Sequence, residues 1–297
     1  MRLSGSVALV EVYSVARVTK SDQKVELRFK DAIPEWVKAC GNDWHLSIMD
    51  WTLTDRLHRK QGRSIARYNL SSELVVYLKR VETAPRFINL LARLFPRQSW
   101  SSSVREWHNL KLARRLGFNT PRPVAVAELF TDGQNLQSVL AIEELYDMQP
   151  LHLAIPYAEQ HLCHEQFYQW KHTLLLAIVR LLQSLHQQHY FHKDMYLCHL
   201  YIHQRCLDRI PENWDRELHL IDFHRFARHP LTGLWWRLKD VSQLLFSMHN
   251  PGLTADDRLF FLRQYLDGTG WLTRPLIRWV VGLRTRNYLH HQLKSRG

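Results

Sequence analysis

The chain has 297 residues, of which 45% are hydrophobic and 23% charged, a balance typical of globular proteins that excludes an intrinsically disordered chain. This length allows one large domain or a two-lobed one. Lys and Arg outnumber Asp and Glu by 40 to 28, and the resulting net charge of +12 favours an anionic partner such as nucleic acid, acidic lipid or a phosphorylated glycolipid.

The cysteines and the apolar segments indicate the cellular compartment in which the protein works. Four cysteines without the spacing of a disulfide framework favour a reducing, cytoplasmic compartment. No stretch approaches the roughly 20 apolar residues that a membrane-spanning helix needs. Glu11 follows the first apolar residues too early for a signal peptide. We therefore expect any contact with a membrane to be peripheral.

Residues 1–60 carry the weakest structural pattern. Residues 7–18 alternate like one or two strands, and Trp36, Trp44 and Trp51 punctuate a polar stretch. We expect this part to be an N-terminal extension and the start of a small lobe.

A strand-rich part is predicted over residues 61–145. Residues 64–70 and 73–80 alternate as strands do, with a turn at Ser71–Ser72 between them and Lys79 near the end of the second. Residues 84–100 form a polar, Pro-containing insertion. Serines 101–103 can then cap a helix that begins near Val104, carries Glu106 in its first turn and ends at Gly117. Strands are also predicted at 124–129 and 138–145.

A helical part is predicted over residues 146–297. Residues 163–190 carry apolar side chains at helical spacing, and shorter helices are predicted at 258–266 and 276–293. An apolar segment at 218–221 reads as a buried strand that ends in Asp222.

Two strings in this part resemble a known family. They read His192-Lys193-Asp194-Met195-Tyr196-Leu197-Cys198-His199 and Ile221-Asp222-Phe223-His224-Arg225. In this order and spacing they resemble the lipopolysaccharide core kinases, which belong to the protein-kinase-like superfamily and phosphorylate inner-core heptose or Kdo sugars. The resemblance extends over roughly residues 62–266.

The resemblance implies an α+β, bilobal protein-kinase-like fold with a small β-rich N-lobe and a larger α-helical C-lobe. It implies an enzyme that uses ATP and Mg²⁺ to phosphorylate a sugar hydroxyl of the lipopolysaccharide inner core. Asp194 would be the catalytic base, and Asp222 would bind Mg²⁺. His199 stands where protein kinases have a metal-binding Asn, so it would bind metal or hydrogen-bond the loop.

The same resemblance suggests the residues that contact ATP. Lys79 would contact the phosphates, and Glu106 would pair with Lys79 or serve only its helix dipole. Lys193 would neutralise the γ-phosphate or a phosphate on the acceptor, or stay solvated. Glu144 lies in the segment where the adenine ring would meet backbone groups. Asp240, at the start of a helix, would anchor the loop backbone from beneath.

Two features of the sequence depart from protein kinases. The glycine-rich phosphate loop is missing. The segment between Asp222 and Asp240, residues 223–239, has 17 residues, too few for a long regulated activation segment. This favours a small-substrate or glycolipid kinase over a signalling protein kinase.

The implied partners are lipopolysaccharide or another anionic glycolipid and the inner-membrane surface, with the enzyme cytoplasmic and peripheral on that side. No nucleic-acid partner is expected, and the oligomeric state stays open. The alternatives are a kinase-like enzyme for another small molecule or protein, and a basic nucleic-acid- or membrane-binding scaffold without turnover. Cys198, His199, His203 and Cys206 could suggest zinc, but their spacing matches no structural zinc pattern.

Overall fold

In this computed structural model, residues 63–69 and 75–81 form the two strands of a β-hairpin. Their side chains alternate, so that every second residue faces the core. β3 (Arg63–Asn69) pairs antiparallel with β4 (Val75–Val81), and Lys79 lies opposite Ile65. The structure describes residues 25–51, 56–60, 62–71, 74–132, 135–267, 279–285 and 288. The strands predicted at 7–18 lie outside these ranges.

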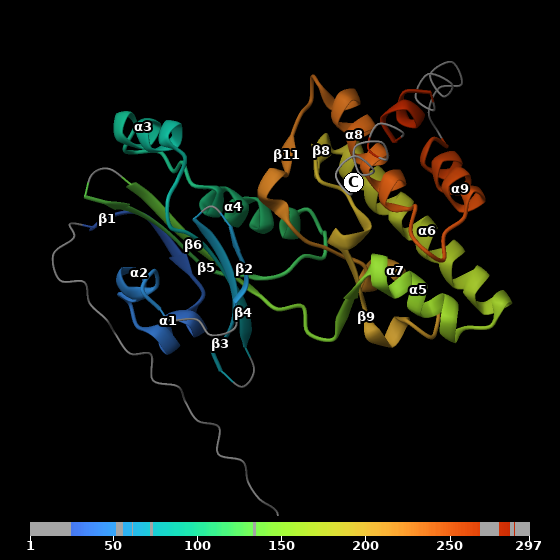
Figure 1. The fold of residues 1–297 in the computed structure, drawn as a ribbon, viewed down its shortest axis with the longest axis horizontal. Helices are drawn as coiled ribbons and strands as arrows, with labels where there is room; N and C mark the ends of the chain where they lie inside the picture. The colour runs from blue at the N-terminus through green and yellow to red at the C-terminus, as the bar shows by residue number, and fades with distance from the viewer. Residues whose placement is uncertain are drawn as a thin grey trace, which may run out of the picture. The chain divides into compact units, whose positions relative to one another are not determined.

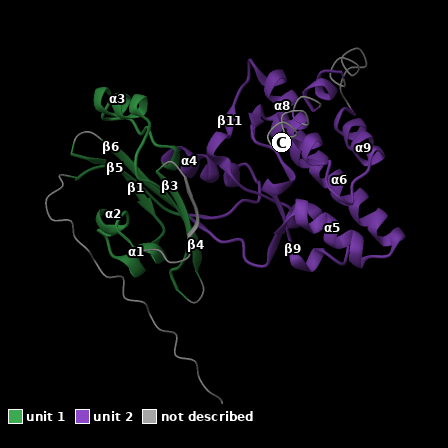
Figure 2. Ribbon diagram, in the orientation of Figure 1, with its two compact units in different colours: residues 1–103, 124–141 green, residues 104–123, 142–297 purple. Residues whose placement is uncertain are grey.

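The chain divides into two compact units (Figure 2). Unit 1 comprises residues 1–103 and 124–141, and unit 2 comprises residues 104–123 and 142–297. Unit 1 is built on a sheet and unit 2 mainly on helices (Figure 1), so the predicted α+β class is confirmed. Residues 104–123, which the sequence placed in the strand-rich part, group with the helical unit.

The described residues of unit 1 form a six-stranded sheet in the order β1-β5-β6-β4-β3-β2. β1 pairs antiparallel with β5, so the part expected as an N-terminal extension supplies an edge strand. The remaining strands of this sheet are β1 (Val25–Ala32), β2 (Arg56–Lys60), β5 (Pro123–Thr131) and β6 (Asn135–Glu143).

Three tryptophans pack against this sheet. Trp36 on α1 (Pro34–Cys40), Trp44 on α2 (Trp44–Ser47) and Trp51 are all buried, with ring centroids 5.5 Å apart for the first pair and 6.0 Å for Trp36 and Trp51. Arg80 on β4 fixes the segment between them, because its Nη1 donates to the carbonyls of residues 48, 49 and 51. The tryptophans in the polar stretch are therefore core residues.

Unit 2 is organised around a long helix, α6 (His164–Gln187), which confirms the helix predicted at 163–190. The short pair β8 (Tyr190–Phe191) and β11 (Ala227–Arg228) follows it, together with a three-stranded sheet in the order β10-β9-β7. The other elements are α4 (Ser102–Arg115), β7 (Met148–Pro150), α5 (Leu151–His161), β9 (Leu200–His203), α7 (Trp214–Glu217), β10 (His219–Leu220), α8 (Gly233–Ser247) and α9 (Ala255–Tyr265).

The structure corrects three expectations in the order of the chain. The insertion at 84–100 contains a helix, α3 (Arg86–Leu94). The strand expected to reach Asp222 ends at Leu220, because pairing with β9 stops there and Asp222 takes a left-handed backbone conformation with φ 66°. Asp240 does not open its helix, since α8 begins at Gly233 and Asp240 lies about two turns inside it.

The C-terminal part is described in pieces. α9 agrees with the helix predicted at 258–266, and residues 279–285 are helical within the range predicted at 276–293. Across the described ranges, no helix combines the length and the hydropathy that crossing a bilayer requires.

Candidate active site

One face of α8 holds the loop that follows β8. Asp240, Gln243 and Ser247 are three and four residues apart, so they form one stripe along the helix. The loop N–H groups donate to this stripe: Lys193 to Asp240 Oδ1 (2.8 Å), Met195 to Gln243 Oε1 (3.3 Å) and Leu197 to Ser247 Oγ (3.0 Å). The stripe thus takes the place of a neighbouring strand as the hydrogen-bonding partner of every second residue of the loop.

Asp240 is the central member of this stripe and is 0% exposed. Its Oδ2 accepts from the backbone N–H of His192 at 2.9 Å and faces His186 Nε2 at 3.3 Å. Burial lowers the pKa of His186, so we take this imidazole as neutral. Its Nε2–H then donates to Asp240 and its Nδ1 accepts from the Tyr265 hydroxyl at 2.6 Å. A buried carboxylate needs several such donors to offset its lost hydration.

The bonds to Asp240 set the backbone that carries Asp194. Lys193 is held in a left-handed conformation with φ 65°, which costs energy for a residue with a side chain. His192 then ties the loop to the segment before Asp222, because its Nε2–H donates to the Ile221 carbonyl at 2.9 Å. The Ile221 N–H in turn donates to the His199 carbonyl at 3.0 Å. The loop and the segment of Asp222 are therefore locked to each other.

Asp194 and Asp222 meet as a result. Within the described part of the chain, ligand atoms of Asp194, Asp222 and His224 all lie within 4.8 Å of one another, and the three side chains are half-buried. His224 Nδ1–H donates to Asp222 Oδ1 at 2.6 Å. Two carboxylates this close repel each other unless a cation lies between them. Oxygen donors of this kind suit a hard divalent cation such as Mg²⁺.

His199 approaches the same carboxylate from another side. Its Nδ1–H donates to the Asp194 carbonyl at 2.7 Å, and its Nε2 lies 3.8 Å from Asp222 Oδ2. Burial lowers the pKa of His199, but hydrogen bonds with Cys198 and the Asp194 carbonyl and the charge of Asp222 outweigh it and raise the pKa to about 9. The Nδ1–H bond to the Asp194 carbonyl is the loop hydrogen bond that the sequence offered as one alternative, and metal binding by His199 stays a prediction.

A cationic cluster lies beside Asp194. Lys193 Nζ lies 4.9 Å from the centre of the Trp236 ring and 3.4 Å from His229 Nε2. Lys239 Nζ lies 5.4 Å from the same ring and donates to the Lys193 carbonyl at 2.8 Å. Burial and the nearby guanidinium of Arg225 lower the pKa of both lysines. Among the described residues neither lysine pairs with a carboxylate.

The helix α4 is joined to the segment after Asp222. Asn109 Nδ2 donates to the carbonyls of Phe223 (2.8 Å) and Phe226 (2.9 Å). Because α4 begins at Ser102, Glu106 lies in its second turn rather than its first, and it is buried. A buried carboxylate needs a partner, which argues against a role for Glu106 with the helix dipole alone.

The remaining predicted residues stand apart from these contacts. Lys79 lies half-buried on β4 of unit 1, and its pairing with Glu106 of unit 2 stays a prediction. Glu144 follows β6 and is half-buried, in a segment where Arg122 pairs with Glu143 at 2.8 Å. Of the four residues considered for zinc, none belongs to the Asp194 cluster in the described part of the chain.

Several residues of the site were missed by sequence reasoning. His224, Lys239, Asn109, Gln243 and Ser247 all contact the loop or the segment of Asp222. The spacing of Asp240, Gln243 and Ser247 was a signal available in the sequence, because three acceptors on one stripe of a helix indicate a polar partner.

Replacing Asp240 with Asn tests the anchor. The Asp240→Asn variant presents an amide N–H₂ to backbone donors and loses the charge that holds them, so we expect it to unfold about 2–3 kcal/mol more easily. Amide hydrogen exchange of Lys193 should quicken beyond the global loss of stability. The matched Asp256→Asn variant, at an exposed position of α9, should behave as the parent. Unchanged exchange at Lys193 in Asp240→Asn would contradict the anchoring role.

Comparison with known proteins finds lipopolysaccharide kinases. Curated relatives are the lipopolysaccharide core heptose(I) kinases WaaP of Pseudomonas aeruginosa, 30% identical over 160 residues, and of Escherichia coli K12, 26% identical over 161 residues. Each alignment covers 54% of this chain and 58% of the relative, so the chain spans somewhat over half the length of these relatives.

A solved structure shows the same fold. "WaaP in complex with acyl carrier protein" superposes with a TM-score of 0.63 at 22% identity, over 89% of this chain and 99% of that chain. The kinase-like fold class predicted from the sequence is thereby confirmed. Residues 55–265 match the profile described as the lipopolysaccharide kinase (Kdo/WaaP) family. The chain belongs to the lipopolysaccharide kinase (Kdo/WaaP) family.

Proposed function

We propose that this chain is a kinase that transfers the γ-phosphate of ATP to a hydroxyl of an inner-core lipopolysaccharide sugar, heptose or Kdo. The observation that carries the proposal is the approach of Asp194 and Asp222 within 4.8 Å, on a loop and a segment that hydrogen bonds hold together. The relatives named as heptose(I) kinases support the choice of acceptor.

Asp194 is the proposed catalytic base. A sugar hydroxyl has a high pKa, so the carboxylate first orients the oxygen and takes its proton as bonding to phosphorus develops. The new bond joins the sugar oxygen to the γ-phosphorus, the bond to the bridging oxygen of the β-phosphate breaks, and ADP leaves. The tether from Asp240 to the backbone N–H of Lys193 keeps Asp194 in place for this transfer.

Asp222 is the proposed ligand for Mg²⁺, and the carboxylate of Asp194 is near enough to contribute. A bound Mg²⁺ would offset the negative charge of the triphosphate. His224 and His199 would orient Asp222, because each faces one of its two carboxylate oxygens. Imidazole is a weaker partner for Mg²⁺ than oxygen, which fits this supporting role.

The ATP contacts outside this cluster rest on the family pattern. Lys79 would contact the phosphates, with Glu106 as its partner, and the segment at Glu144 would receive the adenine ring through backbone groups. Lys193 would face either the γ-phosphate or an anionic group of the acceptor.

The cationic cluster supports an anionic acceptor. Burial, followed by the charge of Arg225, lowers the pKa of Lys193 and Lys239, and Asp194 beside them is half-buried. Such a cluster is relieved of its mutual repulsion when it binds phosphate or carboxylate. Inner-core sugars carry such groups, and their lipid anchor would bring the enzyme to the membrane surface as a peripheral protein.

Replacing Asp194 with Asn tests the proposed transfer. We expect Asp194→Asn to fold normally and to lose about 10²–10⁴-fold in kcat, because it removes the proton acceptor. The assay uses labelled ATP and Mg²⁺ with truncated lipopolysaccharide, a generic protein substrate and an aminoglycoside as acceptors. The Asp208→Asn variant, at an exposed loop position, is the matched control. Turnover like that of the parent in Asp194→Asn would remove Asp194 from the mechanism, and labelling of protein or aminoglycoside alone would reassign the substrate.

Replacing Lys239 tests the acceptor site. We expect Lys239→Met to raise KM for the lipopolysaccharide acceptor about tenfold, with the slow hydrolysis of ATP by water unchanged, because one ammonium–anion contact is lost. Lys239→Arg should recover most of the affinity, and Lys38→Met, on the exposed face of α1, should match the parent. An equal loss of ATP hydrolysis in Lys239→Met would show that the cluster serves ATP instead.

A further inference from the structure

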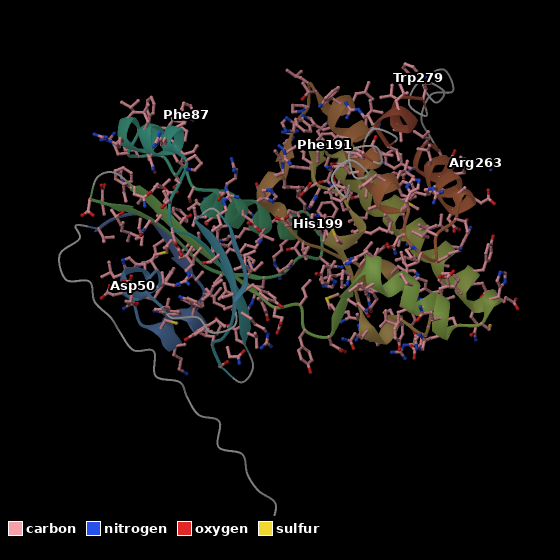
Figure 3. The ribbon with its side chains drawn as sticks, viewed as in Figure 1. Asp50, Phe87, Phe191, His199, Arg263 and Trp279 are labelled. Atoms are coloured by element: carbon pink, nitrogen blue, oxygen red, sulfur yellow. The ribbon has the colours of Figure 1, made fainter. Side chains whose placement is uncertain are left out.

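The helix α3 belongs to unit 1 (Figure 1), whereas the proposed catalytic residues Asp194 and Asp222 belong to unit 2. It falls within residues 84–100, the segment that the sequence indicated as an insertion. Phe87, labelled in Figure 3, marks its position. None of the proposed roles in phosphate transfer uses this helix.

One face of α3 packs against the sheet of unit 1. Ala84 and Ala92 are buried with Phe130 and Leu136 of the sheet, and Ile88 packs beside them. Asn89 fixes the helix further, because its Oδ1 accepts from the Leu136 N–H at 2.9 Å. The helix is therefore held in a defined orientation on the sheet and is a rigid part of unit 1.

The opposite face of α3 is apolar and exposed. Phe87 is 67% exposed, Leu90 51% and Leu94 63%, and their spacing of three and four residues places them on one side of the helix. Phe95, which follows the helix, is half exposed, and Trp100 packs against it with ring centroids 6.2 Å apart. Exposed apolar side chains in one contiguous row indicate an interaction surface.

The charged residues around this row are all basic. Residues 84–100 contain Arg86, Arg93 and Arg97 and no Asp or Glu, and all three arginines are exposed. At 3.6 residues per turn, Arg86 and Arg93 fall on the same flank of the helix, next to Leu90. A helix with an apolar row, a basic flank and nearby aromatic residues is typical of segments that lie in the interface of an anionic bilayer.

We infer that α3 docks the protein on an anionic membrane surface, with Phe87, Leu90 and Leu94 entering the acyl boundary and the arginines contacting lipid phosphates. This inference deepens the proposed function and rests on it in one respect, since a glycolipid acceptor would require the enzyme to work at a bilayer. A bilayer fits better than a protein groove because the row projects from a single short helix and is bordered by exposed arginines.

Vesicle binding tests this inference. The full chain is mixed with vesicles of phosphatidylcholine alone or of phosphatidylcholine with phosphatidylglycerol, and the bound fraction is measured by flotation. We expect binding to the anionic vesicles, weakened at least about tenfold in a Leu90→Glu/Leu94→Glu variant and by high salt. The control is Leu231→Glu, which changes a 97% exposed leucine of unit 2 and should bind as the parent does.

A second measurement separates loss of docking from loss of folding. A Phe87→Trp variant keeps an aromatic side chain at the N-terminal end of the row, and its added fluorescence should shift to the blue when anionic vesicles are added. Melting temperatures of all variants are compared with that of the parent. Equal vesicle binding by the parent and the folded Leu90→Glu/Leu94→Glu variant would overturn the inference. So would saturable binding of an acidic protein, such as acyl carrier protein, at this row without vesicle binding.

Activity assays on these variants distinguish failure of the docking inference from failure of the proposed kinase function. If the protein docks through α3 but labels no lipopolysaccharide acceptor, the docking inference stands and the kinase proposal falls. If Leu90→Glu/Leu94→Glu phosphorylates a delipidated acceptor as the parent does but loses activity on the same acceptor in vesicles, both stand. If it retains full activity on vesicles, the docking inference falls and the kinase proposal remains.

Discussion

The buried carboxylate of Asp240 is the constraint on which the catalytic loop depends. It lies inside α8 and accepts from the backbone N–H groups of His192 and Lys193. Burying a carboxylate without hydrogen-bond donors costs much free energy, and burying the loop N–H groups without acceptors also costs free energy. Each group thus requires the other, and the pairing holds Lys193 in a left-handed backbone conformation. Asp194, the next residue, takes its direction from that turn.

The same loop is then joined to the segment that bears Asp222. His192 Nε2–H donates to the Ile221 carbonyl, and the Ile221 N–H donates to the His199 carbonyl. Asn109 of α4 adds two bonds beyond Asp222. Two carboxylates consequently face each other, flanked by His224 and by the cationic cluster of Lys193 and Lys239. Such a site gathers charges of both signs at fixed positions, which is what transfer of a phosphoryl group to a hydroxyl demands.

The sequence predicted the parts of this arrangement that depend on local pattern. The hairpin of β3 and β4, the helix α6 and the two strings around Asp194 and Asp222 all carry their signal within a few residues. The anchoring role of Asp240 was also predicted, from the family pattern, and its bonds to the loop agree with it. The roles of Gln243 and Ser247 were not, because their partners lie 48 and 50 positions away and a single Gln or Ser in a helix does not show which loop it bonds. Trp36 and Trp44 were read in a polar stretch, although the sheet buries them. α3 was missed because its prolines at 85 and 96 suggested a loop, whereas they bound the helix.

The central proposal is that Asp222 binds a divalent cation beside the proposed base Asp194, and binding of Mn²⁺ followed by electron paramagnetic resonance tests it most directly. We expect Asp222→Asn to weaken Mn²⁺ binding about tenfold or more, while His199→Gln leaves it within about threefold, since carboxylate oxygens are the preferred ligands. Mn²⁺ binding of parental strength in a folded Asp222→Asn variant would contradict it.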